Sequence, residues 1–86
     1  MIVRTHLLCP YQNCEVYNRT DSLRIQALID EKRNVILQKP MDITSSKIEF
    51  QNKKWIRPSS CPYCNKHVDV VINETNQGRD VYLRKR

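Results

Sequence analysis

Three observations predict a small, mainly β fold, with an α+β fold as the alternative. The chain has 86 residues, enough for one domain with a core of marginal size. Its apolar residues fall in short runs separated by turn-forming residues, and several runs alternate as β-strands do. Its four cysteines form two close pairs, and each pair opens with Cys-Pro-Tyr, which predicts two similar turns, here called knuckles. We expect a single domain over 1–86, with a first knuckle at 7–17, an insert at 20–58, a second knuckle at 59–72 and a basic tail at 79–86.

The segment before the first cysteine and the segment after the second predict a hairpin. Residues 2–8 favour a strand that leads into the knuckle, and residues 15–19 favour the return strand. Residues 20–22 indicate either a helix start or a turn. Segment 22–30 fits a capped helix by its residue types, but its apolar residues alternate as in a strand. A strand is favoured because residues 30–34 then form a hairpin turn into a further strand at 35–37.

The middle of the chain predicts a second hairpin. After Pro40, residues 41–46 form a mostly polar connection. Residues 47–51 alternate cleanly, which predicts a strand with Ile48 and Phe50 directed inward. Residues 52–54 indicate a turn, so a strand at 55–57 would pair with the strand at 47–51.

The end of the chain predicts the second knuckle and the strands that follow it. Residues 58–60 lead into Cys61, and residues 67–73 form an almost continuous apolar strand. Residues 74–78 contain the single glycine and predict a turn, followed by a last strand at 79–86. The total is seven or eight short strands.

The four cysteines predict a structural zinc site. Cys9 and Cys14 are separated by four residues, Cys61 and Cys64 by two, and 46 residues lie between the pairs. Paired thiols of this kind are typical of one tetrahedral Zn²⁺ bound by four thiolates. Pro after the first cysteine of each pair helps the chain to turn, and Asn65 tolerates the left-handed conformation that often follows such a turn.

Both knuckles, Cys9-Pro10-Tyr11 through Cys14 and Cys61-Pro62-Tyr63-Cys64, resemble the zinc-ribbon (rubredoxin-like) class of zinc finger. The resemblance covers about a third of the chain. It implies a β-rich fold with one four-thiolate zinc between two hairpin turns. Three features depart from the usual pattern: the wider first spacing, the missing glycine after each knuckle and the long insert.

Other roles for the cysteines lead to different predictions. Cys61-Pro62-Tyr63-Cys64 is also a redox motif, but there a helix follows it and this sequence continues as a strand. The four thiols could also be ordinary core residues. His6 or His67 could replace one cysteine as the fourth ligand.

The charge of the chain predicts an acidic partner. The net charge is +6, and basic residues gather around the single tryptophan and in the tail. Cations next to an aromatic ring suit nucleic acid, because they meet phosphates while the ring stacks on bases. A single tryptophan is, however, often a core residue. The candidate binding residues are Lys53, Lys54, Trp55, Arg57, Arg84, Lys85 and Arg86.

These observations favour a non-enzymatic binding protein. The first hypothesis is a nucleic-acid-binding protein, DNA or RNA, in transcriptional or translational regulation. The alternative is a protein-interaction module that docks an acidic surface on a larger protein such as a polymerase. No run of about 18 apolar residues predicts a membrane span, and no secretory signal is evident, so we expect a cytoplasmic or nuclear protein. Exposed edge strands leave both monomer and dimer open.

Overall fold

The computed structural model describes residues 1–17 and 24–86, and in these residues it contains strands but no helix. The strands are β1 (Ile2–Leu7), β2 (Ile25–Asp30), β3 (Val35–Gln38), β4 (Lys54–Ser60), β5 (His67–Thr75) and β6 (Gly78–Lys85). The expected mainly β fold is therefore confirmed, and its α+β alternative is not seen. Nothing in the described part of the chain forms a helix that could cross a membrane.

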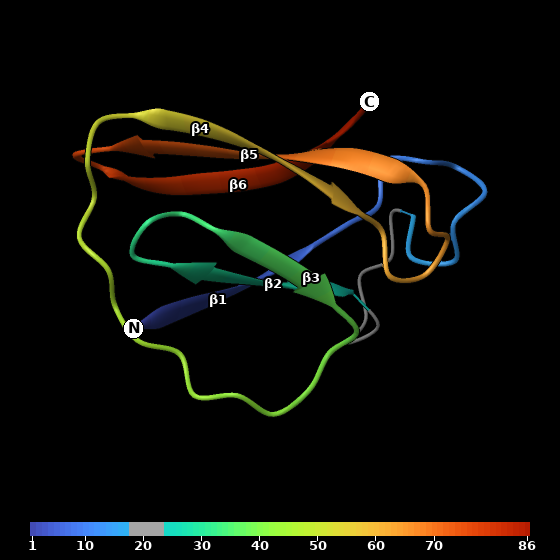
Figure 1. The fold of residues 1–86 in the computed structure, drawn as a ribbon, viewed down its shortest axis with the longest axis horizontal. Coiled ribbons are helices and arrows are strands. Elements are labelled where there is room, and N and C mark those ends of the chain that lie inside the picture. Colours follow the sequence, from blue (N-terminus) through green and yellow to red (C-terminus); the bar gives the residue numbers. More distant parts are fainter. Residues whose placement is uncertain (18–23) are drawn as a thin grey trace.

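The strands form two three-stranded antiparallel sheets of the same design. The first sheet has the order β1-β2-β3 and the second β4-β5-β6, so each half of the chain is a knuckle hairpin followed by one more strand. The sheets lie one above the other, with both knuckles at the same end (Figure 1). Strand β3 contacts β4 and strand β1 contacts β6, so the two layers also meet along their edges. The two similar knuckles therefore stand at equivalent places, between the first and second strands of each sheet.

The core lies between the sheets because each central strand turns alternate apolar residues inward. Ile25, Ala27 and Ile29 of β2 are fully buried. Val68, Val70 and Ile72 of β5 face them from the other layer and are also fully buried. A small core of β-branched residues is what a chain of this length can build.

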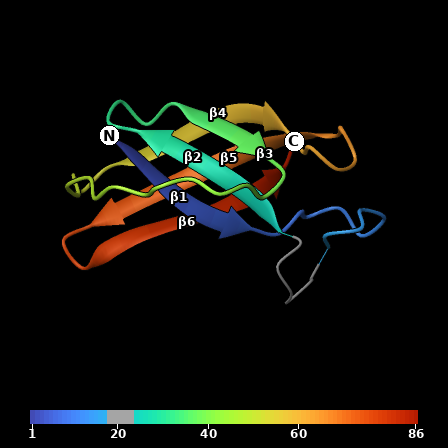
Figure 2. The ribbon, with the colours of Figure 1, turned by 90° about the horizontal axis from the view of Figure 1, so that it is seen from below.

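A connecting segment, residues 39–53, crosses the outer face of the first sheet, and we call it the strap (Figure 2). Gln26 is buried on this outer face because its side-chain amide binds both the carbonyl and the N–H of Met41, at 3.0 Å each. Arg4 donates to the carbonyl of Ile43 at 2.9 Å, and the N–H of Ser46 donates to Ile2 at 2.7 Å. The strap therefore covers the first sheet without forming a strand.

A buried ion cluster holds the end of the fold opposite the knuckles. The Glu74 carboxylate on β5 accepts two bonds from Arg33 in the β2–β3 turn, at 2.6 and 2.7 Å, and one from Arg79 on β6 at 2.7 Å. Both arginines also reach strap carbonyls, those of Glu49 and Ile48. The N–H of Gln51 donates to Glu74 at 3.0 Å. One carboxylate thus ties both sheets and the strap together.

The structure corrects three expectations about the elements. Residues 47–51 belong to the strap, so the hairpin with 55–57 is wrong: β4 pairs with β5 instead. Phe50 points outward, 48% exposed, with the guanidinium of Arg79 over its ring. The alternation at 47–51 reflects an extended backbone whose polar groups bind side chains rather than a neighbouring strand. Residues 15–17 form a turn rather than a return strand, and residues 18–23, including the predicted helix start or turn, lie outside the described residues. Six strands are seen in the described part, where seven or eight were expected.

Candidate metal centre

The second knuckle is a tight turn between β4 and β5, closed by backbone hydrogen bonds. The N–H of Cys61 donates to Lys66 at 3.0 Å, and the N–H of Asn65 donates to Cys61 at 2.8 Å. Asn65 has φ of 60°, the left-handed conformation predicted for it. The N–H of Tyr63 points at the Cys61 sulfur, 3.4 Å away, which stabilises negative charge on that sulfur. The turn is thus built for a thiolate.

The first knuckle reaches a comparable geometry by a longer path. The N–H of Cys14 donates to Tyr11 at 3.1 Å, and the N–H of Tyr17 donates to Cys14 at 3.0 Å, so two turns follow one another. The two additional residues, Gln12 and Asn13, are exposed. The wider spacing is absorbed at the surface, and the cysteines themselves remain buried.

The four sulfurs lie close enough to share one metal ion. All four are within 4.8 Å of one another. Cys9 and Cys64 are 3.7 Å apart, as are Cys14 and Cys61, and each of these pairs joins one knuckle to the other. Four thiolates arranged tetrahedrally around Zn²⁺ at about 2.3 Å would be about 3.8 Å apart. The donor set and its spacing therefore fit a four-thiolate metal site.

Burial explains why these thiols need a cation. Cys9, Cys14 and Cys61 are buried, and Cys64 is partly exposed. Burial raises the pKa of Cys9, and it raises that of Cys61 to about 11 despite the N–H groups that point at the sulfur. Burial also opposes ionisation of Cys64, but the N–H of Lys66 and the neighbouring thiols outweigh it and lower the pKa of Cys64. A divalent cation would supply the charge needed to hold all four as thiolates.

Each knuckle tyrosine bonds to the backbone of the other half. The Tyr11 hydroxyl donates to the carbonyl of His67, where β5 begins, at 2.9 Å. The Tyr63 hydroxyl donates to the carbonyl of Arg24, just before β2, at 3.5 Å. A lysine ammonium also lies over each ring: Nζ of Lys66 is 4.8 Å from the centre of the Tyr11 ring, and Nζ of Lys39 is 5.2 Å from that of Tyr63. The two knuckles are thus held together by reciprocal contacts as well as by the cysteines.

A disulfide, a redox pair and a histidine ligand each fit this geometry less well. A disulfide needs sulfurs about 2.05 Å apart, and the closest pairs here are 3.7 Å apart. The Cys-Pro-Tyr-Cys segment runs into strand β5, whereas the redox motif requires a helix at that point. Within the described residues, the donor cluster consists of cysteines, and both His6 and His67 are exposed outside it.

The predicted nucleic-acid-binding residues divide into two groups in the structure. Trp55 packs against the core, with the guanidinium of Arg33 over its ring at 4.8 Å. The Arg57 side chain also points inward, since its Nε donates to the carbonyl of Arg33 at 2.9 Å. Lys85 lies over the Tyr11 ring at 5.6 Å. The remaining residues, Lys53, Lys54, Arg84 and Arg86, are exposed.

Two important features were missed at the level of sequence, one ion cluster and one exposed tyrosine. The Arg33–Glu74–Arg79 cluster joins residues up to 46 positions apart, and charged residues of these types are usually exposed. The second is Tyr82, which is 42% exposed on β6 and was not singled out. The available signal was its place between Val81 and Leu83. Both of these apolar residues point inward from β6, so the residue between them points outward.

Fold and site together define a small all-β domain whose four cysteines can hold a metal ion. Compared with known proteins, the chain matches no family model, no curated protein and no solved structure. The similarity to zinc ribbons therefore consists of the two knuckles and the geometry of their sulfurs.

Proposed function

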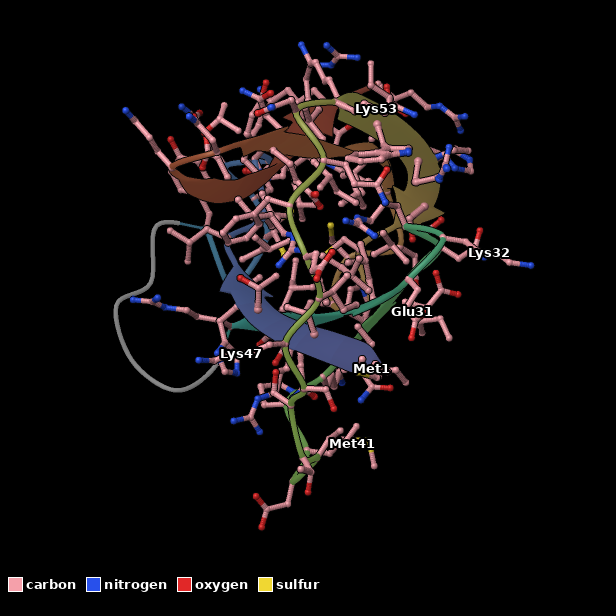
Figure 3. All side chains as sticks on the ribbon, turned by 90° about the vertical axis from the view of Figure 1, so that its left-hand side faces the viewer. Met1, Glu31, Lys32, Met41, Lys47 and Lys53 are labelled. Atoms are coloured by element: carbon pink, nitrogen blue, oxygen red, sulfur yellow. The ribbon has the colours of Figure 1, made fainter. Side chains whose placement is uncertain are left out.

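We propose that this protein is a small nucleic-acid-binding protein whose single Zn²⁺ is structural, acting in transcriptional or translational regulation by binding rather than catalysis. The observation that carries the proposal is where the exposed cations lie. Lys53, Lys54, Arg84 and Arg86 are exposed on or beside the β4-β5-β6 sheet, on a chain of net charge +6. Nitrogen-tipped side chains project from the outer side of this sheet, near Lys53 (Figure 3).

In this proposal the metal acts indirectly. A closed four-thiolate site has no open position for a substrate, so its contribution is to hold the knuckles. The second knuckle sets the start of β5, the central strand of the β4-β5-β6 sheet, which we call the basic sheet. Zinc would therefore fix the positions of β4 and β6, which carry the exposed cations on either side of β5. Removing the metal should abolish nucleic-acid binding by disordering the sheet.

The proposal is tested by comparing two double variants that lose the same charge. Lys53→Gln/Lys54→Gln changes the first residue of β4 and the residue before it, and Lys32→Gln/Lys47→Gln changes exposed lysines on the β2–β3 turn and in the middle of the strap. Figure 3 shows Lys53 next to the upper sheet and Lys32 and Lys47 away from it. Fluorescence anisotropy with labelled DNA and RNA oligonucleotides, over a salt series, measures binding.

We expect the first variant to bind more weakly and to lower the slope of log Kd against log salt by about 1 to 2, because each phosphate contact contributes about one. The second variant should bind like the parent protein. Equal losses in both variants would show attraction by net charge alone. No binding by the zinc-loaded parent at low salt would reject the function.

The alternative, a module that docks an acidic protein surface, gains one observation from the structure. Ile56 and Tyr82 are 43% and 42% exposed, and they lie on the same sheet as the exposed cations. Competition separates the two functions. If polyglutamate displaces an oligonucleotide as well as unlabelled nucleic acid does, at equal charge concentration, an acidic protein partner is favoured.

A further inference from the structure

The outer face of the β4-β5-β6 sheet carries an apolar row. Ile56 pairs with Val71, and Val71 pairs with Tyr82, so the three side chains lie side by side across the strands. Their neighbours Val70 and Ile72 belong to the core, so this row points the other way. Val71 is nevertheless fully buried, while Ile56 and Tyr82 are about two-fifths exposed. Neighbouring side chains therefore cover Val71, and we call the row of Ile56, Val71 and Tyr82 the strip.

The two halves of the fold differ at this position. On the first sheet the corresponding outer row is Arg4, Leu28 and Ile36, and the strap crosses that face. The strap engages Arg4 through the carbonyl of Ile43, whereas Ile36 at the other end of that row is 63% exposed. Among the described residues, no comparable segment crosses the outer face of the second sheet (Figure 1). The strip is thus uncovered in the half of the chain that carries the predicted basic residues.

Cations flank the strip on both sides. On one side the neighbouring row is Lys54, Asn73 and Asp80, with the cation on β4 and a carboxylate on β6. On the other side, Arg84 lies one row from Tyr82, across from Asp69. Arg84 and Arg86 each approach the Asp69 carboxylate only to 3.5 Å and remain about half exposed. These guanidinium groups can therefore still reach an anion from solvent.

A groove continues from the strip beyond the edge of β6. It has a volume of about 390 Å³, and Tyr82 lies on its wall together with Tyr17, His6, Leu8 and Pro10. Tyr17 is 41% exposed, so the groove offers a second aromatic side chain close to the strip. Apolar and aromatic surface thus extends from β4 across the sheet and past its edge.

We propose that this strip and groove bind single-stranded nucleic acid, with Tyr82 stacking on a base and Lys54 and Arg84 meeting the phosphates on either side. The proposal rests on the proposed function and specifies its ligand and its surface. Exposed ring and apolar surface between cations matches a strand whose bases are unpaired, because each base then presents an apolar face next to its phosphate. A duplex buries those faces in its own stack and leaves phosphates and base edges for contact, so Tyr82 has no base face to stack on.

The decisive comparison is Tyr82→Ala against Tyr82→Phe, with Ile36→Ala as the control on the first sheet. The probes are a fluorescein-labelled 12-nucleotide DNA and RNA of mixed sequence, and the same strands annealed to their complements. We expect the parent protein to bind single strands about tenfold more tightly than duplexes. Tyr82→Ala should lose about tenfold or more in affinity for single strands, since stacking on one base contributes about that much. Tyr82→Phe and Ile36→Ala should stay within about twofold.

Other outcomes identify which idea fails. If Tyr82→Ala keeps full affinity while Lys53→Gln/Lys54→Gln loses it, nucleic acid is bound through its phosphates without a base stacking on Tyr82, and the strip is not its site. If nothing binds the parent, the proposed function itself fails. If sedimentation shows a dimer that Tyr82→Ala dissociates with unchanged affinity for nucleic acid, the strip is a self-association surface. Should Tyr82→Ala unfold, amide shifts of the parent on adding the 12-nucleotide strand decide: shifts confined to residues outside the strip, its flanking cations and the groove overturn the proposal.

Discussion

Replacing Glu74 with glutamine removes the negative charge at the centre of the buried ion cluster. Burial alone would raise the pKa of this carboxyl, but hydrogen bonds from Arg33 and Arg79 and the N–H of Gln51 lower it from 4.5 to about 2. That difference corresponds to about 3 kcal/mol of folding free energy at neutral pH. Loss of one partner from a buried pair typically costs a similar amount, about 3–5 kcal/mol.

The pH dependence follows from the direction of this change. The carboxyl has a lower pKa in the folded state than in the unfolded state, so the folded state binds fewer protons. Its stabilising contribution is complete above about pH 4.5 and is lost as the pH falls toward 2. The difference in stability between parent and Glu74→Gln should therefore be constant from pH 7 to about 5 and shrink below that. Using the difference removes the effect of acid on the cysteine site, which both proteins share.

Urea unfolding followed by circular dichroism, with zinc in excess, measures the effect. A chain of this size has a slope of about 1 kcal/mol per molar urea, so the midpoint should fall by about 3 M, or the variant should be unfolded without urea. Glu49→Gln is the control: its side chain is exposed, and only its backbone carbonyl contacts the cluster. A midpoint for Glu74→Gln within about 0.5 M of the parent would refute the view that this cluster stabilises the fold.

Three further predictions concern the knuckles and the last turn. Cys61→Ser should lose zinc by elemental analysis and unfold at 25 °C, because it removes a fully buried donor; one zinc per chain with an unchanged melting temperature would contradict the site. Gly78→Ala should lower the free energy of unfolding in urea by about 1–3 kcal/mol, because Gly78 has φ of 150° and a Cβ added there would meet no other atom, which leaves backbone strain as the cause. Asn76→Ala should be nearly neutral, and equal effects in the two variants would refute backbone strain. Asn65→Ala should cost about 1 kcal/mol and Asn65→Gly less, since φ is 60° there; the reverse order in thermal melts would argue against the left-handed turn.

Much of the local structure could be predicted because its determinants are close in sequence. Strands β1, β2, β3 and β5 follow from alternating or continuous apolar runs, and the turn after Asp30 follows from the polar residues between two such runs. Cysteine spacing and the Cys-Pro-Tyr repeat predicted the four donors that the fold gathers within 4.8 Å. The left-handed Asn65 was also predictable, because the requirement comes from one turn.

Partners that are distant in sequence could not be predicted in the same way. An extended, alternating segment looks the same whether it pairs with a strand or, like residues 47–51, is bound by side chains of Arg33 and Arg79. The inward direction of Trp55 depends on the register between β4 and β5, which a slip of one residue would reverse.

The sequence by itself determined the fold class, the cysteine donors and the basic character of the chain, because these depend on residue type and short spacing. Only the tertiary structure decided which charges are buried, as at Glu74, and which face of the second sheet is left open beside Tyr82. Burial and exposure depend on which strands meet. That is settled by packing across the whole chain, where a neighbouring segment such as the strap crosses the outer face of one sheet and not that of the other.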